Sequence, residues 1–303
     1  MTSWVDPGPW ATVLAASERI DFKIDEVLPE DTRFDFGVAF LPDALTGVSG
    51  LSCLNGDEQR LVGHLRAHGY LGMFGVIEEM ILPFLLGQTR VEPLDETRAL
   101  LRFASEEAKH IELFRRFSAA FGQQFAHRAR LVGPADAFAR AVLAHSELSV
   151  ALAVLQIEWM TQRHWLECVR GDESLEPSFK RLLRFHWMEE AQHARLDALL
   201  VQKLASRLSA EERAEGVEGY LSIVRLVDGA LSAQVELDLV SLEEALEREL
   251  DEGERAQFRS VQLASMRKTY LLDGMTHPKF LASITDVAPF APELVQSAAL
   301  ALQ

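Results

Sequence analysis

The sequence predicts an all-α protein. From Asp57 onward, apolar residues recur at the spacing of an amphipathic helix. No run of useful length alternates between apolar and polar residues, as a half-buried strand would. Proline, glycine and capping residues divide the chain into long segments instead. With 303 residues, 48% of them hydrophobic, the chain can bury a sizeable core. We therefore expect one helical domain over residues 1–303.

Three regions of this domain are expected to differ in structure. Residues 1–56 contain several prolines and glycines and should wrap the bundle as an irregular segment, with short strand-like or helical pieces possible, for example at 10–20. Residues 57–208 should form a four-helix core, and residues 209–303 should add further helices. The core helices are expected at residues 57 to about 86, 93 to 121, 134 to about 171 and 177 to about 208. The additional helices are expected from the capping box at 209–212, and near residues 231–250, 252–272 and 292–300.

Composition excludes several classes of protein. The net charge of −16 argues against nucleic acid and anionic membrane surfaces as partners, because both require a basic surface. Cys53 and Cys168 are too few and too far apart to predict a disulfide framework or a zinc site. The sequence does not begin with basic residues followed by an apolar stretch, so we expect no signal peptide. The most apolar segment, residues 69–87, is interrupted by two glutamates and Pro83, so we expect no membrane span and a cytoplasmic protein.

Two segments carry the residues of a metal site. His186, Glu190 and His193 stand at i, i+4 and i+7, which places them on one face of a helix. Glu107 and His110 repeat the Glu-x-x-His spacing of Glu190 and His193. Iron and manganese accept carboxylate oxygen together with imidazole nitrogen, so each Glu-x-x-His turn can serve one metal. His186 is expected to be a ligand, with a hydrogen-bonding or core role as the alternative.

The other two core helices each offer one carboxylate. Glu158 follows two almost wholly apolar turns, where a lone carboxylate calls for a partner. Glu78 falls on a heptad seam of apolar residues and should point inward, although the neighbouring Glu79 remains an alternative. The separations between Glu78 and Glu107 and between Glu158 and Glu190 are similar. Each separation has the length needed for the chain to finish one long helix, turn, and return along the next helix to the same depth in the bundle.

Charge supports a pair of metal ions. The four carboxylates together carry −4, which two divalent cations cancel. Without metal, carboxylates gathered in a dry bundle would repel one another and take up protons. The predicted metal ligands are Glu78 (or Glu79), Glu107, His110, Glu158, His186, Glu190 and His193.

Other polar residues near these motifs are expected to have ordinary roles. Glu106, Glu189 and Lys109 flank the ligands in sequence and should be solvated. The remaining histidines lack comparable partners, which favours structural or exposed positions for His64, His68, His127, His145, His164 and His277.

The ordered set of carboxylates resembles that of the ferritin-like diiron proteins over residues 57–208. The spacing His186-x3-Glu190-x2-His193 is most similar to the p-aminobenzoate N-oxygenase family, whose diiron site has an extra histidine one turn before the last Glu-x-x-His. This resemblance implies one iron held by Glu78, Glu107 and His110, and a second held by Glu158, His186, Glu190 and His193, with some of the carboxylates bridging the two. It also implies dioxygen activation and oxygen transfer to an arylamine nitrogen.

The expected function is that of a non-haem diiron monooxygenase acting on a small organic substrate. Two iron ions are the expected cofactor, with manganese possible and dioxygen as co-substrate. C-hydroxylation or desaturation is the alternative reaction, and a non-catalytic ferritin-like iron-binding protein is the alternative class. No dinucleotide-binding fingerprint is present, so electrons should come from a separate reductase or small redox protein. A homodimer is the expected assembly.

Overall fold

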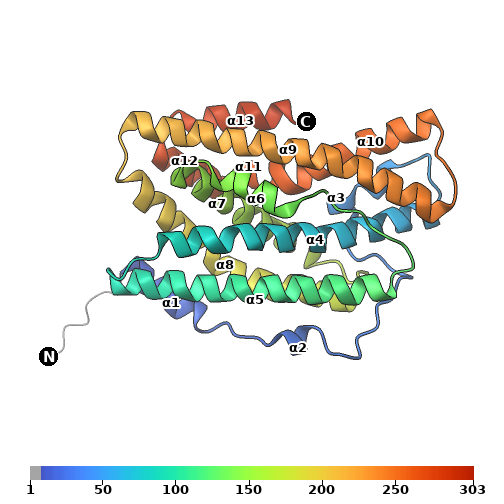
Figure 1. Ribbon diagram of the computed structural model, residues 1–303, viewed down its shortest axis with the longest axis horizontal. Coiled ribbons are helices and arrows are strands. Elements are labelled where there is room, and N and C mark those ends of the chain that lie inside the picture. Colours follow the sequence, from blue (N-terminus) through green and yellow to red (C-terminus); the bar gives the residue numbers. More distant parts are fainter. Residues whose placement is uncertain (1–7) are drawn as a thin grey trace.

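The computed structural model describes residues 8–303, and over these residues every regular element is a helix. Figure 1 shows long helices lying side by side along the longest axis of the molecule. The prediction of an all-α fold with a four-helix core, additional C-terminal helices and an irregular N-terminal segment is confirmed. The core helices are α4 (Gly56–Gln88), α5 (Leu94–Gln124), α7 (Glu147–Arg163) and α8 (Pro177–Ala205).

The core is built from two helix pairs. Short connections join α4 to α5 and α7 to α8, and the members of each pair pack against each other. The link between the pairs, residues 125–146, is longer and contains α6 (Ala135–Leu143). In Figure 1 this link leaves the far end of α5 and returns along the bundle to α7. One long crossover between two helical pairs is the topology of ferritin-like bundles.

Side-chain caps begin the long helices where the sequence predicted them. The Asn55 side chain accepts hydrogen bonds from the backbone N–H groups of Asp57 and Glu58 at the start of α4. Ser209 and Glu212 form the expected capping box at the start of α9 (Ala210–Leu246). Each cap satisfies backbone donors that have no partner within the helix, which fixes the first turn.

Two predicted helix boundaries were wrong. The third core helix is not continuous from residue 134 to about 171, because α6 ends at Leu143 and α7 begins at Glu147. The Ser146 hydroxyl accepts from the N–H of Ser149 and starts the new helix. Beyond Arg163 the chain continues as the π-helical segment η2 (His164–Val169). The helix expected near residues 231–250 is the second half of α9, which continues through Leu231 to Leu246.

The first part of the N-terminal segment covers the α5–α8 side of the bundle. The short elements of the whole segment are α1 (Pro9–Ser17), α2 (Ile24–Val27), α3 (Asp43–Thr46) and the 3-10 turn η1 (Val48–Gly50). Helix α1 packs against both α5 and α8. Phe34 and Phe40 pack their rings against Phe121 of α5. The part of this segment before α3 therefore shields one side of the core from water, whereas α3 and η1 pack against α10.

The C-terminal helices cover the opposite side. Helix α9 packs against α7 and α4, and α10 packs against α9. The elements after α9 are α10 (Glu252–Arg267), the π-helical η3 (Lys268–Leu272), α11 (Asp273–Met275), α12 (Pro278–Val287) and α13 (Ala291–Ala301). The four-helix core thus lies between two covering layers.

Helix α4 is the most apolar of the core helices. By length and composition alone it could cross a membrane, and 56% of its most apolar stretch is buried inside the protein. A core helix that is covered on most of its surface has the same composition. Its position between α5 and α9 accounts for the apolar sequence.

A close approach between α11 and α7 depends on Gly274. A Cβ atom at this position would lie 2.5 Å from the backbone oxygen of Gln156. We expect Gly274→Ala to lower the free energy of unfolding by about 1–3 kcal/mol in urea denaturation, because the backbone of α7 cannot move aside easily. Gly229 of α9 is the matched control, because nothing lies within 4 Å of its Cβ position. Gly229→Ala should raise stability by about 0.5–1 kcal/mol through helix propensity. Equal effects of the two substitutions would contradict this explanation.

Candidate metal centre

The seven predicted ligands enter the core from all four bundle helices, and each of them is at most 3% exposed. Two groups of four residues have ligand atoms within 4.8 Å of one another. The first group is Glu78, His110, His186 and Glu190, and the second is Glu107, His110, Glu190 and His193. Because His110 and Glu190 belong to both groups, the two groups form one continuous cluster that is suitable for two metal ions.

The structure distinguishes Glu78 from Glu79. Glu78 is 3% exposed and lies in the first group. The Glu79 side chain is 39% exposed and forms an ion pair with Arg115 at 2.7 Å. Glu78 is therefore the carboxylate that α4 contributes to the cluster, as the heptad seam indicated.

Two ligands are placed differently from what the family resemblance implied. His186 lies with Glu78, its Nε2 being 3.1 Å from Glu78 Oε1, and not with Glu158 and His193. Glu158 is buried and interacts with Glu190, but it belongs to neither group of four. The same residues are gathered in one interior, and the two groups that their geometry defines are not the two sets that the resemblance implied.

The contacts within the cluster resemble those between ligands of a common ion. His110 Nδ1 lies 3.0 Å from Glu190 Oε1, and His193 Nδ1 lies 3.0 Å from Glu107 Oε1. His110 Nδ1, Glu190 Oε1 and Glu107 Oε1 nevertheless have no hydrogen-bond partner. Two atoms that each lie about 2.1 Å from one ion, at right angles, are separated by about 3.0 Å. Mixed carboxylate and imidazole donors suit iron or manganese. The side chains therefore fit two iron ions, with manganese possible.

Electrostatics in the metal-free protein show why cations are needed. Burial disfavours the charged form of Glu190, but His186 and His193 beside it hold its pKa well below the usual range. Burial opposes protonation of His186 as well, yet the Glu190 carboxylate raises its pKa to about 9. Burial and the neighbouring Glu78 carboxylate raise the pKa of Glu107 well above its usual value. Protons on histidine and glutamate thus supply the positive charge that metal ions would supply.

Two further glutamates surround the cluster, and the prediction that they are solvated was wrong. Glu106 and Glu189 are only 2% and 1% exposed. Glu106 Oε2 lies 3.0 Å from His193 Nε2, and Glu189 Oε2 lies 2.8 Å from His110 Nε2. Glu106 of α5 therefore reaches His193 of α8, and Glu189 of α8 reaches His110 of α5. An Nε2–H that donates to these carboxylates leaves the Nδ1 lone pair facing the cluster. The signal in the sequence was the doubled glutamate, because both helices read Glu-Glu-x-x-His.

Cations and a hydroxyl balance these outer carboxylates. Arg102 pairs with Glu106 at 2.7 Å, and the Ser17 hydroxyl of α1 donates to the same carboxylate at 2.7 Å. Lys109 pairs with Glu189 at 2.5 Å, and its side chain is only 20% exposed, so it is not a freely solvated flank. A cation therefore lies beside each outer carboxylate and offsets its charge.

These carboxylates give a testable role to residues outside the ligand set. We expect Glu106→Gln and Glu189→Gln each to weaken metal binding by about 10–100-fold, because the imidazole that each one orients exchanges a charged carboxylate acceptor for a weaker neutral amide. Competition with a chelator measures the affinity. Glu112→Gln, at an exposed position on the same helix, is the control that should leave affinity unchanged. Equal affinity of all three variants would contradict the positioning role.

Asp197 is a buried carboxylate that the sequence analysis missed. It continues the stripe of His186, Glu190 and His193 at the next helical position and is fully buried. Neither of its oxygens has a hydrogen-bond partner, and burial raises its pKa well above the usual range. The signal in the sequence was the position of Asp197, eleven residues after His186 and on the same face of the helix. A neutral Asp197 can remain in this interior without a counterion.

Aromatic rings fill the space around the ligands. The Phe103 ring lies 4.0 Å from the His193 ring, centre to centre. Phe74 and Phe114 present edges to His186 at 5.5 and 4.9 Å. All three phenylalanines are at most 1% exposed. The cluster therefore lies in a dry, low-dielectric environment, where charge interactions are strong.

Comparison with known proteins finds related folds only among solved structures. No family model matches the sequence, and no curated protein matches it. The chain is similar to an R2-like ligand-binding oxidase, a tyrosine-to-phenylalanine mutant with an anaerobically reconstituted Mn/Fe cofactor (15% identity, 89% of this chain and 94% of that chain, TM-score 0.48). It is also similar to the same mutant with an aerobically reconstituted Mn/Fe cofactor (13% identity, 87% and 93%, TM-score 0.49). Membership of the p-aminobenzoate N-oxygenase family stays a prediction.

Proposed function

We propose that this protein is a non-haem dimetal oxygenase that uses two iron ions, with manganese as a possible substitute, and dioxygen. The observation that carries the proposal is the continuous cluster of buried carboxylates and imidazoles, in which His110 Nδ1 and both oxygens of Glu107 make no hydrogen bond within the described residues. When bound, two such ions would supply the redox chemistry that activation of dioxygen requires. A purely structural role would leave these polar atoms unpaired in the core at considerable cost.

The side chains around the two ions would have different roles. Glu190 and His110, which belong to both groups, would hold the two ions next to each other. Glu106 and Glu189 orient the imidazoles of His193 and His110. The oxygen of Glu158 that has no hydrogen-bond partner is available beside Glu190 as a further ligand or as an acceptor for a proton. The phenylalanines around the cluster exclude water from the reaction.

The first candidate reaction is N-oxygenation of an arylamine, which the spacing of His186, Glu190 and His193 supports. C-hydroxylation or desaturation of a small organic molecule is the alternative within the same chemistry. Insertion of one oxygen atom from dioxygen requires two electrons and two protons to convert the other atom to water. Since no nucleotide fingerprint is present, we propose that an external reductase or small redox protein supplies the electrons.

Anaerobic reconstitution with ferrous iron tests this proposal. We expect two irons per chain after dialysis, measured by elemental analysis, and a transient visible absorption on mixing with dioxygen. An arylamine and an alkyl substrate should then be compared for faster decay of that absorption. Mass spectrometry with ¹⁸O-labelled dioxygen should show label in the oxygenated product.

Three results would contradict the proposal. Many loosely held irons per chain would indicate iron storage. Absence of bound metal would indicate a helical protein without a cofactor. Two bound irons that leave every amine and alkyl substrate unchanged, with an electron donor present, would exclude oxygenation.

A further inference from the structure

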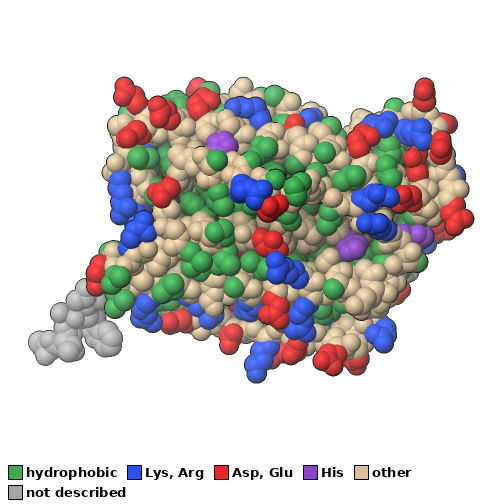
Figure 2. Space-filling model, viewed as in Figure 1, with side chains coloured by type: hydrophobic (Ala, Val, Ile, Leu, Met, Phe, Trp, Pro, Cys, Tyr) green, Lys and Arg blue, Asp and Glu red, His purple; other side chains and the backbone are tan. Residues whose placement is uncertain are grey.

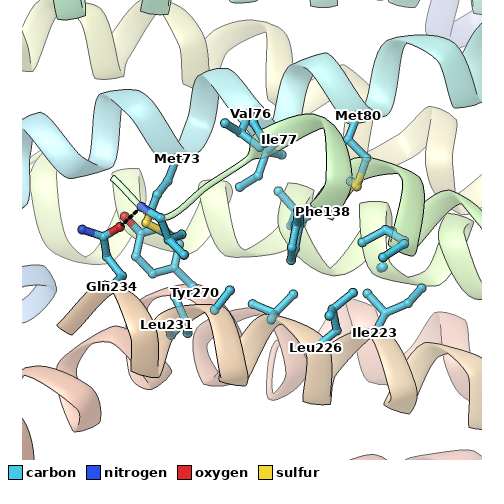
Figure 3. A pocket seen from close by; sticks show the side chains of 18 of the residues that line it. Met73, Val76, Ile77, Met80, Phe138, Ile223, Leu226, Leu231, Gln234 and Tyr270 are labelled. Atoms are coloured by element: carbon cyan, nitrogen blue, oxygen red, sulfur yellow. Dashed lines mark hydrogen bonds between the residues drawn. The ribbon is translucent and has the colours of Figure 1, made fainter. Parts of the chain in front are cut away.

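A large apolar cavity lies outside the metal-binding interior. It has a volume of about 360 Å³ and is surrounded by α4, α6, α7, α9 and η3. Figure 3 shows Met73, Ile77 and Met80 of α4 pointing toward α9, with Phe138 of α6 beside them. In Figure 2, hydrophobic side chains gather on the surface where α4, α6 and α9 meet. The cavity is therefore bounded mainly by aliphatic and aromatic groups.

The α4 side of this cavity faces away from the metal cluster. Met73, Ile77 and Met80 lie on one face of α4, and at 100° per residue Glu78 is turned roughly 100–160° from each of them. No predicted metal ligand is among the residues that line the cavity. Helix α4 thus directs its carboxylate to one side and its aliphatic face to the other.

Helix α7 repeats this arrangement. Ala153, Ile157 and Met160 line the cavity at the same offsets from Glu158 that Met73, Ile77 and Met80 have from Glu78. Both helices therefore turn their carboxylates from the cavity by the same angle. Because α4 and α7 each direct cavity-lining residues and a carboxylate to different sides, and the lining and the cluster share no residue, the two are distinct sites.

Three polar side chains in the wall, those of Gln156, Tyr220 and Gln234, already have protein partners. The Tyr220 hydroxyl donates to Gln156 Oε1 at 2.6 Å, and Gln156 Nε2 donates to the backbone oxygen of Tyr270 at 3.3 Å. Gln234 accepts from the Val132 N–H at 2.7 Å, which Figure 3 marks, and donates to the backbone oxygen of Arg130 at 2.7 Å. Among the polar side chains of the described lining, these bonds leave the Tyr270 hydroxyl as the group that can still bond a ligand.

Charge is absent from the lining as well. None of the described residues that line the cavity is Asp, Glu, Lys or Arg. An ionised group placed there would lose its hydration without gaining a counterion, which is very unfavourable. A hydrocarbon group would gain contacts with the methionine, isoleucine and phenylalanine side chains. The cavity lining therefore favours uncharged ligands over ionised ones.

We propose that this cavity is a second ligand site, separate from the metal centre, that binds an uncharged hydrophobic small molecule. Its volume lies within the range of about 300–1,000 Å³ that small-molecule sites occupy. The ligand class is an alkyl or aryl compound without an ionised group. Half-buried Met73, Ile77 and Phe138 give such a molecule access from the surface.

Octan-1-ol and octanoate are matched probes for this proposal, because they share a chain and differ in charge. Titration calorimetry on the metal-loaded full chain should show octan-1-ol binding at least tenfold more tightly than octanoate. The same preference should persist in the metal-free protein, since no metal ligand lines the cavity. Octanoate binding as tightly as the alcohol, or no binding of either probe, would overturn the proposal.

Substitutions that fill the cavity locate the bound probe. Ala230→Trp and, as a smaller change, Val227→Phe should weaken octan-1-ol binding by more than tenfold while two metals per chain remain. Ala119→Trp, at an exposed position on α5, is the control and should bind the alcohol normally. Circular dichroism checks that each variant is folded. Unchanged affinity for octan-1-ol in folded Ala230→Trp and Val227→Phe would overturn the proposal. A change of oligomeric state in these variants would also overturn it, because it would show that a second copy of the chain covers this face.

Discussion

Replacing Glu190 with alanine is expected to abolish binding of both metal ions. Its Oε1 lies 3.0 Å from His110 Nδ1 and 2.7 Å from His186 Nε2. Its Oε2 lies 3.0 Å from His193 Nδ1. Because this one carboxylate stands between three imidazoles, its loss removes a ligand from both groups. The cost should exceed the 10–100-fold caused by loss of an outer hydrogen bond. Elemental analysis after dialysis should show a fall from two metals per chain to none.

Two variants control this experiment. Glu79→Ala removes an exposed carboxylate that pairs with Arg115, and it should retain both metals. Glu107→Gln replaces a buried carboxyl whose pKa burial raises well above the usual range, so the amide imitates the protonated group of the metal-free protein. Its metal-free form should therefore unfold at nearly the wild-type temperature while metal binding is lost. Retention of two metals by Glu190→Ala would show that ions bind elsewhere.

The features that local sequence determines could be predicted. Helical periodicity and side-chain caps gave the long helices, since a cap such as Asn55 acts on the turn that follows it. The inward direction of Glu78 followed from its apolar neighbours at heptad spacing. The gathering of carboxylates and histidines followed from two Glu-x-x-His turns at matched separations, because helices of similar length return to the same depth.

Features that depend on distant segments could not be predicted. Glu106 stands one residue from a ligand and looked solvated, but Ser17 of α1 covers it and Arg102 neutralises it. Its burial depends on how the N-terminal segment packs, which the pattern of α5 does not contain. The cavity has the same origin, since its wall combines α4 with α6 and α9. The break at Ser146 was missed because helical periodicity continues across a single cap.

The stability of the metal-free protein is expected to fall as pH rises from 6 to 10. The pKa of His186 is raised from 6.5 to about 9, against burial, by Glu190. A histidine with a raised pKa stabilises the folded state fully below pH 6.5, and this contribution is lost as pH rises through about 9. The raised pKa values of His110 and His193, where burial is outweighed by Glu190 and the other neighbouring carboxylates together, act in the same direction. For His186 alone the loss is on the order of 3 kcal/mol. Urea denaturation across this pH range measures it.

Metal binding should oppose this trend. The ions need neutral imidazoles, so they compete with the protons that the metal-free histidines carry, and metal affinity should increase with pH up to about 9. Loading at pH 7 should release protons, which an indicator dye in weakly buffered solution can detect. The Glu190→Ala variant should release none. If the metal-free protein became more stable on passing from pH 7 to pH 9, or if loading released no protons, the histidines would not hold the positive charge of the empty site.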